Sequence, residues 1–387
     1  MENANNTRSI VNSSDMYVYP YSTAWLAIVP LVISLISSVT VIGNLMVIVA
    51  FIRDHCIRFK VANLFILNLA ITDFIVGAFM WPVNISWLIK DEWVHGEIVC
   101  KVWLIVDYTI TMMSALTLVM ISWNRYCVLS MGIKYQAFQT KKRVGLILFS
   151  TWTAVLLWYS FLAFAWSPLT GQYSVDYTYN CELEFTGHLV ITLIVNVLQF
   201  FIPFTILLSL NIAVYNNIRQ RSRGIVGPSP PILPPADLPG PGARRLTPDS
   251  LKATTSKSIS AALPAEPCPD KYAPSTSLNA PRDPSKTEGW TFARHRKAAV
   301  VLGILVGCFL VCWVPIQITS VMFSICGTKC VTYLNWEVTN ALVWGNSLIN
   351  PFIYAATNRH FRRNFRHFLL LDRWACDMKC SKTKCCS

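Results

Sequence analysis

The feature that most constrains the fold is an apolar run from Cys100 to Tyr126 with a charged residue near each end. Asp107 and Arg125 are about 18 residues apart, and a helix of that length rises about 27 Å, close to the roughly 30 Å hydrocarbon thickness of a bilayer. Steps of seven and eleven residues return to nearly the same helix face, so Cys100, Asp107, Ser114 and Arg125 lie along one stripe. That stripe must face protein or water.

Asp107 is the leading candidate for a site residue. A charged side chain inside a span costs roughly 2.5–3.5 kcal/mol on insertion scales, and such residues usually mark a binding site or an ion path. The alternative is a structural carboxylate that pairs with a basic neighbour, but the other apolar runs hold no Lys or Arg. We therefore interpret Asp107 as a residue that binds a cation.

The composition also requires lipid. Hydrophobic residues make up 53% of the 387-residue chain and charged residues 14%, so one water-soluble core could not bury its apolar surface. A net charge of +13 would suggest nucleic acid in a soluble protein. Here the basic residues lie beside the apolar runs, and we expect membrane lipid rather than nucleic acid as their partner.

Seven apolar runs are long enough to span a bilayer. Lys and Arg follow the first, third, fifth and seventh runs and precede the sixth, which places the N-terminus outside by the positive-inside rule. We predict an all-α membrane protein, a seven-transmembrane helix bundle with a C-terminal interfacial helix. Its expected segments are an extracellular glycosylated tail (1–24), spans one to five (25–218), a disordered third cytoplasmic loop (219–293), spans six and seven (294–356), and an interfacial helix with a Cys-rich cytoplasmic tail (357–387).

Local sequence patterns predict the properties of three of these segments. Sequons at Asn5 and Asn12 predict glycosylation of the N-terminal tail. The third cytoplasmic loop is rich in Pro, Ser and Gly, a composition that does not fold alone. Phe361, Phe365 and Phe368 recur at helical spacing among Arg and His, the pattern of a helix that lies in the membrane interface.

Cysteines report on both membrane faces. Cys100 and Cys181 fall on the outer side, where disulfides persist, and we predict that they are bridged. Cys326 and Cys330 are placed to close a second, smaller ring. Cysteines near the inner surface are expected to be palmitoylated, with a metal-binding cluster as the weaker alternative. They are Cys376, Cys380, Cys385 and Cys386.

Together, these motifs resemble those of rhodopsin-like G-protein-coupled receptors, over nearly all of the chain except the third cytoplasmic loop and the tail. They are Gly43-Asn44, LAxxD ending at Asp73, Cys100, NRY at 124–126, Trp152, Pro203, FxxCWxP at 309–315 and NPxxY at 350–354. The resemblance implies a plasma-membrane receptor with an extracellular N-terminus. It also implies as partners a heterotrimeric G protein of the Gi/o type, arrestin and receptor kinases.

Within that family, Asp107 resembles the aspartate of amine receptors that pairs with a ligand ammonium. CKVWLIVDY, NLAITDFIVGAF and VWGNSLINP look most like histamine receptors of the third and fourth subtypes, and muscarinic acetylcholine receptors are next. Gln199 stands where those histamine receptors have a glutamate, and Ile316 where both groups have a tyrosine. A small amine is therefore the expected ligand, whether histamine-like, acetylcholine or another monoamine.

The expected pocket surrounds Asp107 with ring faces, because aromatic rings bind cations. Its expected residues are Trp103, Asp107, Tyr108, Thr111, Gln199, Trp313, Ile316, Trp336, Asn340 and Trp344. By resemblance, a deeper cluster of polar residues binds sodium. No cofactor and no other metal is expected. The residues of this cluster are Asp73, Ser114, Asn346 and Asn350.

Coupling to the G protein is expected at the cytoplasmic ends of the helices. The coupling and switch residues are Asn124, Arg125, Tyr126, Pro315, Asn350, Pro351 and Tyr354. Asn124 and His295 occupy positions where the nearest receptors carry acids. Neither can be a full negative charge beside Arg125, so we expect a weakened inactive state.

Two other classes of membrane protein also place acids inside spans, transporters and intramembrane enzymes. A transporter would also carry an acid inside a span, but we find no internal repeat and no paired broken helices at matching positions of two halves. An intramembrane enzyme would need a second catalytic group beside Asp107 or Asp73, and no known catalytic motif accompanies either. No enzymatic reaction is expected.

Overall fold

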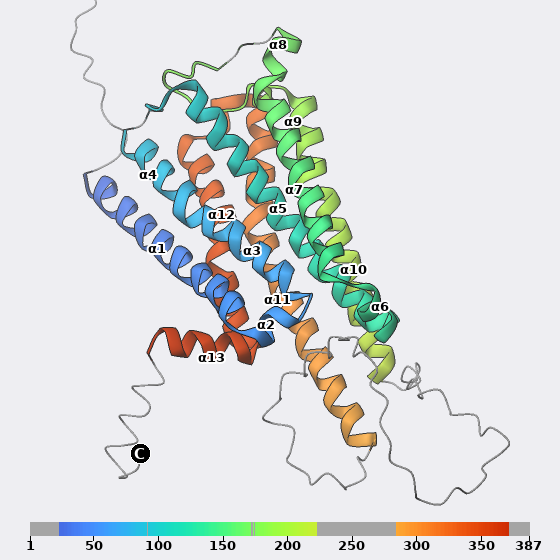
Figure 1. The fold of residues 1–387 in the computed structure, drawn as a ribbon. Coiled ribbons are helices and arrows are strands. Elements are labelled where there is room, and N and C mark those ends of the chain that lie inside the picture. The colour runs from blue at the N-terminus through green and yellow to red at the C-terminus, as the bar shows by residue number, and fades with distance from the viewer. Residues whose placement is uncertain (1–22, 91, 172, 174, 223–283, 371–387) are drawn as a thin grey trace, which may run out of the picture.

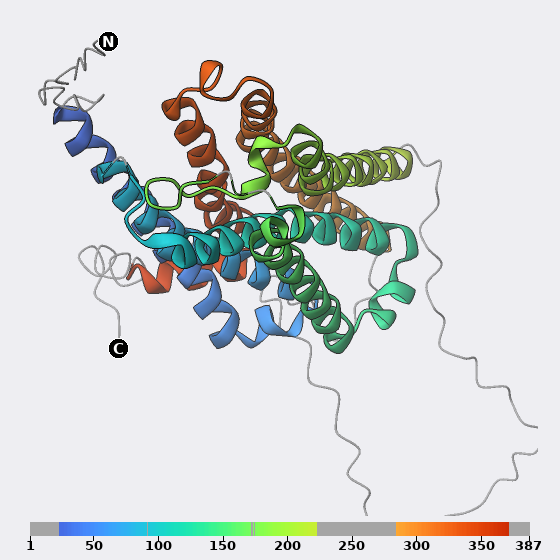
Figure 2. The same cartoon turned by 90° about the horizontal axis from the view of Figure 1, so that it is seen from above.

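In a computed structural model of the protein, the described residues are 23–370, with gaps at 91, 172, 174 and 223–283. Within them every regular element is a helix. The long helices pack side by side into one elongated bundle (Figure 1), and the view along the bundle shows them surrounding its interior (Figure 2).

Seven long helical segments make up the described part of the bundle. They are α1 (Thr23–Arg53), α3–η1–α4 (Asn63–Ile75, Val76–Met80, Trp81–Lys90), α5 (Gly96–Met131), α7 (Lys141–Phe164), α9–η3–α10 (Leu189–Asn196, Val197–Phe201, Ile202–Ser222), α11 (Pro284–Cys326) and α12 (Tyr333–Thr357). Short helices lie in the connections: α2 (His55–Phe59), α6 (Ile133–Phe138), α8 (Trp166–Thr170), η2 (Glu184–Gly187) and η4 (Gly327–Lys329).

Six of these segments are long and apolar enough to cross a membrane by composition alone. The seventh, α12, falls below that level because polar side chains such as Asn346, Ser347 and Asn350 are buried on its inner face. It packs along both α1 and α11. The all-α bundle expected from the sequence is confirmed.

Two of the segments contain a turn of π-helix, which the sequence did not predict. In a regular α-helix the ring of Pro203 would collide with the carbonyl of Gln199, four residues earlier. The π turn η3 covers Gln199 and ends just before Pro203, so the wider turn removes that conflict. It also places Gln199 in the bundle interior, where its side chain is buried.

Polar side chains tie the helices together inside the bundle. Asn68 of α3 donates to Thr117 Oγ1 of α5 at 2.7 Å and accepts from Trp152 Nε1 of α7 at 2.8 Å. Asn44 of α1 donates to the backbone oxygen of Ser347 in α12 at 3.2 Å. These bonds fix neighbouring helices where no water competes for the same groups.

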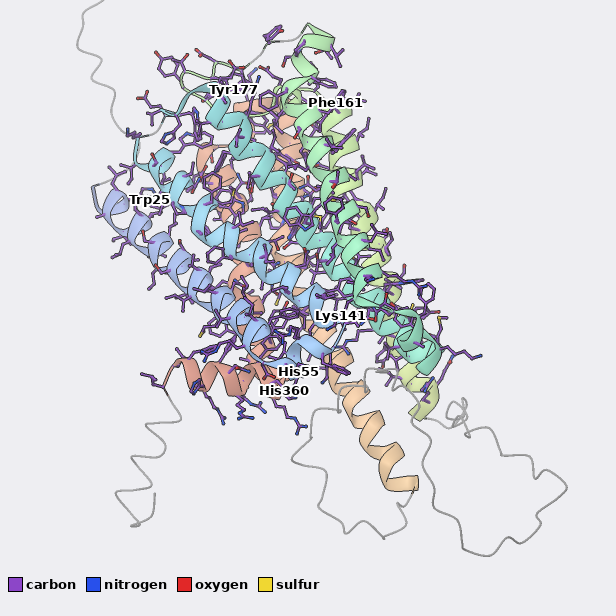
Figure 3. All side chains as sticks on the ribbon, viewed as in Figure 1. Trp25, His55, Lys141, Phe161, Tyr177 and His360 are labelled. Atoms are coloured by element: carbon purple, nitrogen blue, oxygen red, sulfur yellow. A yellow bond between two sulfur atoms is a disulfide. The ribbon has the colours of Figure 1, made fainter. Side chains whose placement is uncertain are left out.

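The helix expected after the last span is α13 (Arg359–Phe368), which lies across the end of the bundle (Figure 1). Its Phe361 and Phe365 are buried against the bundle rather than turned to the interface, while Phe368 is partly exposed. Asn364 donates to Asp54 Oδ2 at 2.8 Å, and Asp54 also caps α2. Figure 3 labels His360 on α13 and His55 on α2, two helices that contact each other at this junction.

Both predicted outer disulfides are confirmed, Cys100–Cys181 and Cys326–Cys330. The boundaries of the third cytoplasmic loop were wrong. Helix α10 continues to Ser222 and α11 begins at Pro284, so both ends of the segment 219–293 are helical. Hydropathy marks where lipid ends, but Lys, Arg, Ala and Glu favour helix in water and extend it further. Disorder of 223–283 stays a prediction, since those residues lie outside the described part.

The close packing of α1 against η1 gives a test of the fold. A Cβ on Gly77 would lie 2.9 Å from Val41 Cγ2 and 3.1 Å from the Val41 backbone nitrogen, and Ser37 Oγ donates to the Gly77 carbonyl at 2.7 Å. Gly77→Ala should therefore destabilise the protein by roughly 1–3 kcal/mol, seen as a lower thermal unfolding midpoint in detergent. Gly145→Ala in α7, with open space around it, is the matched control and should be neutral or slightly stabilising. Equal midpoints for the two variants would contradict this packing.

Candidate functional site

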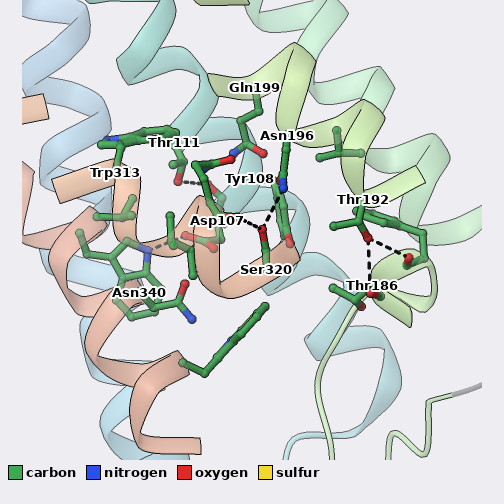
Figure 4. Close-up of a pocket in the computed structure, with 17 residues that line it drawn as sticks. Asp107, Tyr108, Thr111, Thr186, Thr192, Asn196, Gln199, Trp313, Ser320 and Asn340 are labelled. Atoms are coloured by element: carbon green, nitrogen blue, oxygen red, sulfur yellow. Dashed lines mark hydrogen bonds between the residues drawn. The ribbon is translucent and has the colours of Figure 1, made fainter. Parts of the chain in front are cut away.

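A pocket lies among α5, α9–η3, α11 and α12, with η2 of the second outer loop against it (Figure 4). Nine of the ten ligand residues predicted from the sequence line it. They are Asp107, Tyr108, Thr111, Gln199, Trp313, Ile316, Trp336, Asn340 and Trp344. Residues from four separate helical segments thus converge on the site, as the sequence predicted.

Asp107 of α5 is held from one side by α12. Trp344 Nε1 donates to Asp107 Oδ1 at 2.7 Å, and Thr111 Oγ1 donates to the Asp107 backbone oxygen at 2.5 Å. The Thr111 side chain also lies within hydrogen-bonding reach of the carboxylate, and within the described residues no basic side chain forms an ion pair with it. The aspartate is therefore oriented by an indole N–H and has no cationic partner within the described residues.

Aromatic side chains form most of the remaining wall near Asp107. Trp313 lies at its inner end, 2% exposed, and contacts Phe309 at 4.7 Å between ring centroids. Tyr108 packs against Phe185 of η2 at 6.5 Å, and Trp336 packs against Phe323 at 5.4 Å. Ring faces next to a carboxylate suit a cation, since the quadrupole of each ring attracts positive charge.

Trp103 is the predicted ligand residue that does not line the pocket. It packs behind Trp344 at 6.0 Å between ring centroids, and Trp81 contacts Trp344 at 5.2 Å. Trp87 and Trp93 complete this tryptophan cluster around Trp103. One helical turn before Asp107, Trp103 lies on the same side of α5 but faces α4, so sequence spacing alone misplaced it. The cluster fills the space between α4 and α12, and the pocket extends instead toward α9 and α11.

Sequence reasoning missed the polar residues at that far side. Asn196 of α9 and Gln317 and Ser320 of α11 line the pocket; Asn196 and Gln317 are buried, and Ser320 is half-buried. A signal existed: Asn196 is three residues before Gln199, and Gln317 and Ser320 are four and seven residues after Trp313, which puts each on a pocket-facing side of its helix. Thr186, the polar pocket residue of η2, carried no such periodic signal, because it lies in a loop region.

A second buried carboxylate lies deeper in the bundle at Asp73. Asn350 donates to Asp73 Oδ2 at 2.7 Å, whereas Oδ1 is buried and has no partner within the described residues. Ser114, predicted from the sequence, and Ser347, not predicted, are both close enough to interact with this carboxylate. Asn346 is buried one residue before Ser347. These oxygen-bearing groups suit a small hard cation such as sodium.

The predicted coupling residues lie at several levels of the bundle: Pro315 beside the pocket, Asn350 at Asp73, and the others toward the end where α13 lies. Arg125 is exposed, whereas the preceding Asn124 is 3% exposed and its Oδ1 has no partner within the described residues. Tyr354 is buried and packs against Phe361 of α13 at 5.9 Å. Pro351 lies against α1, where a Cβ on Gly43 would lie 3.1 Å from its ring.

Several sequence predictions fall on residues that the structure does not describe. The glycosylation sites Asn5 and Asn12, and the palmitoylation sites Cys376, Cys380, Cys385 and Cys386, lie outside the described residues. The side chain of His295 does too. These assignments stay predictions.

Comparison with known proteins bears on the identity of the site. The chain is 28% identical to the 5-hydroxytryptamine receptor 1B of Canis lupus familiaris over 369 residues, covering 92% of this chain and 90% of the relative. The Equus caballus receptor of the same name is 29% identical with the same coverage, and the Mus musculus receptor is 28% identical with 92% and 91% covered. These relatives do not show the expected similarity to histamine receptors, so that finer assignment stays a prediction. The family model described as "7 transmembrane receptor (rhodopsin family)" matches residues 43–354. The chain therefore belongs to the rhodopsin family of seven-transmembrane receptors, a family of receptors rather than enzymes.

Proposed function

We propose that the protein is a plasma-membrane receptor that binds a small amine at Asp107 and activates a heterotrimeric G protein. The observation that carries the proposal is the set of neighbours around this carboxylate. Trp344 orients it, no described basic residue neutralises it, and aromatic rings surround it. An ammonium supplies the missing charge through a charge-assisted hydrogen bond. Relatives that are named for the amine 5-hydroxytryptamine support the same ligand class.

The contacts of Trp313 suggest how binding reaches the cytoplasm. Trp313 contacts Phe309 at 4.7 Å and Phe200 of η3 at 6.3 Å, so these rings join α11 to α9–η3–α10 directly below the pocket. Pro315 follows two residues later inside α11 and lacks a backbone N–H, which makes a kink easy to change. A ligand that favours one packing of these rings shifts the population of α11 positions.

The remaining partners are part of the same proposal. We propose coupling to a Gi/o-type G protein, followed by receptor kinases and arrestin, at the cytoplasmic surface around Arg125 and Tyr354. We also propose that sodium binds at Asp73 with Ser114, Asn346 and Asn350, and that it stabilises the inactive state. The unpartnered Asp73 Oδ1 supports that ion site.

Nucleotide exchange tests the receptor function. The full chain, reconstituted in lipid with purified Gi/o, Gs or Gq heterotrimers, is titrated with 5-hydroxytryptamine, histamine, acetylcholine, dopamine and tyramine. At least one amine should accelerate exchange, most strongly on Gi/o. If no amine changes exchange on any heterotrimer while each G protein responds to a control receptor, the proposal is wrong.

The first prediction about function concerns Asp107, the proposed partner of the ligand ammonium. Asp107→Ala should weaken binding of the active amine several hundredfold or more, because losing one partner of a buried charge pair costs roughly 3–5 kcal/mol. Asp176→Ala, which removes an exposed loop aspartate, is the matched control and should bind as the natural chain does. Affinity is measured by radioligand binding at equal surface expression. A loss below about threefold would refute the role of Asp107.

The second prediction separates histamine from amines with a single positive charge. If the ligand is histamine, Gln199→Glu should strengthen its binding by roughly 1–3 kcal/mol, since a hydrogen bond to a charged group is worth about that much. Gln199→Leu controls for loss of the amide without a new charge. Unchanged or weaker histamine binding by Gln199→Glu would speak for an amine whose ring end is neutral.

The third prediction concerns resting activity. Asn124 is a buried neutral amide directly before Arg125, and Asn124→Asp puts a negative charge there. Because an exposed ion pair is worth only about 0–1 kcal/mol and a buried one more, ligand-free exchange should fall a few-fold to tenfold. The double variant with His295→Asp should fall further.

Asn124→Ala separates the charge from simple loss of the amide and should not lower ligand-free exchange. All variants are compared at matched receptor density. If neither Asn124→Asp nor the double variant lowers basal exchange, the missing acids do not set the resting state.

A further inference from the structure

Lys101 is a buried cation in the first turns of α5, on a face of the helix that does not point into the pocket. The residue is 9% exposed. It lies six residues before Asp107, a rotation of about 240° around the helix, and it is not among the residues that line the pocket. Lysine is rarely buried without partners, because its ammonium loses hydration there. The contacts of Lys101 therefore indicate its role.

Three partners from three segments surround the Lys101 ammonium. Glu97, one turn earlier in α5, pairs with it at 2.6 Å between Nζ and Oε1. Nζ lies 5.1 Å from the ring centroid of Tyr177 in the second outer loop and 5.6 Å from that of Phe164 at the end of α7. At these distances a ring face attracts a cation. Lys101 thus joins α5, α7 and the loop.

The ring contacts carry more of this junction than the ion pair does. The Glu97 side chain is 55% exposed, so water screens its pair with Lys101. Tyr177 is half-buried, and a cation–π contact strengthens as the cation loses water. Burial, and after it the carboxylates of Glu184, Glu97 and Glu182, raise the pKa of the Tyr177 hydroxyl. The Lys101 ammonium offsets the negative charge that these carboxylates bring to the loop.

Tyr177 belongs to a stretch of the loop that leads to the pocket wall, and Figure 3 labels it at the end of the bundle far from α13. The Val175 backbone N–H donates to Glu184 Oε2 at 3.2 Å, which ties this stretch to the first residue of η2. The next two residues of η2, Phe185 and Thr186, line the pocket. Lys101 is therefore connected to the pocket wall through the loop.

Other tethers of the loop leave room for such a contact. The Cys100–Cys181 disulfide fixes one point, about which the residues before it can move. The Trp93 N–H donates to the Tyr179 backbone oxygen at 2.7 Å, but water can replace a single hydrogen bond of an outer loop when it opens. Lys101 holds the stretch at Tyr177, farther from the disulfide than either point.

We propose that Lys101 is a positioning residue whose ammonium holds the ring of Tyr177, keeps the second outer loop seated against the pocket and thereby slows the escape of a bound amine. This inference rests on the proposed amine function and adds a kinetic control to it. A ligand behind a seated loop leaves when the loop opens, so the open fraction sets the dissociation rate. Two cation–π contacts together shift that fraction roughly five- to thirtyfold.

Hydrogen–deuterium exchange of the ligand-free, full-length protein in lipid tests the positioning step. The amides of 175–187 report the open fraction of the loop. Lys101→Met, of similar length but uncharged, should speed their exchange roughly five- to thirtyfold, and Tyr177→Leu roughly fivefold. Lys101→Arg and Tyr177→Phe keep the charge and the ring, so exchange should match the natural chain. Lys329→Met, which removes an exposed lysine of η4, is the matched control and should also change nothing.

Dissociation of a radiolabelled active amine tests the consequence for binding. Lys101→Met and Tyr177→Leu should accelerate dissociation by the factors seen in exchange, and the Arg and Phe variants should restore the natural rate. The double variant should be no faster than Lys101→Met, because that change has already removed the Tyr177 contact. Association should accelerate as well, so affinity falls by less than the dissociation rate rises.

The outcomes separate this inference from the amine function. Unchanged loop exchange in Lys101→Met and Tyr177→Leu overturns it, as does a Lys101→Arg variant that exchanges as fast as Lys101→Met. Faster exchange with unchanged dissociation also overturns it, although the amine function then stands. If Lys101→Met does not fold, Tyr177→Leu against Tyr177→Phe decides. If no amine binds the natural chain, the amine function fails, and exchange alone decides whether Lys101 seats the loop.

Discussion

The structure depends on one constraint: inside a bilayer, a polar group that finds no partner in the protein finds none in the solvent. Asn68 satisfies it by joining three helices through Thr117 and Trp152. The same constraint explains why the two aspartates inside the helix bundle are each oriented by a donor from α12, Asn350 for Asp73 and Trp344 for Asp107. α12, the segment not apolar enough to count as a span by composition, supplies both of these donors.

The same constraint makes the buried polar oxygens without a hydrogen-bond partner candidates for functional positions. Among the amide and carboxylate oxygens of the described residues, four are buried without a partner, on Asn44, Asp73, Asn124 and Gln317. Three of them lie at the levels where a receptor must respond: Gln317 in the ligand pocket, Asp73 in the polar interior and Asn124 beside Arg125. At each position a ligand, an ion or a change of helix packing would supply the partner that the oxygen lacks.

Much of the fold and part of the site could be predicted from the sequence. A charge inside an apolar run is a strong signal, so Asp107 and its aromatic neighbours were found, as were the disulfides. The π turn η3 was not, because it accommodates the contact of a proline ring with a carbonyl and leaves no periodic trace. Trp103 was misplaced because helical spacing gives a side of the helix, not the neighbour it meets. Gln317 and Ser320 resembled ordinary interior polar residues until the structure placed them in the pocket wall.

The indole N–H of Trp344 provides the most direct test of the central claim, that the Asp107 carboxylate is the ammonium site. Its ¹⁵N–¹H resonance can be assigned in the reconstituted receptor by its loss in Trp344→Phe and followed as an active amine is added. The account predicts that the resonance shifts over the same concentration range that stimulates nucleotide exchange, and that the N-acetylated, uncharged form of the amine leaves it in place. Stimulated exchange with an unmoved Trp344 resonance would contradict the account, because the cation would then be bound elsewhere.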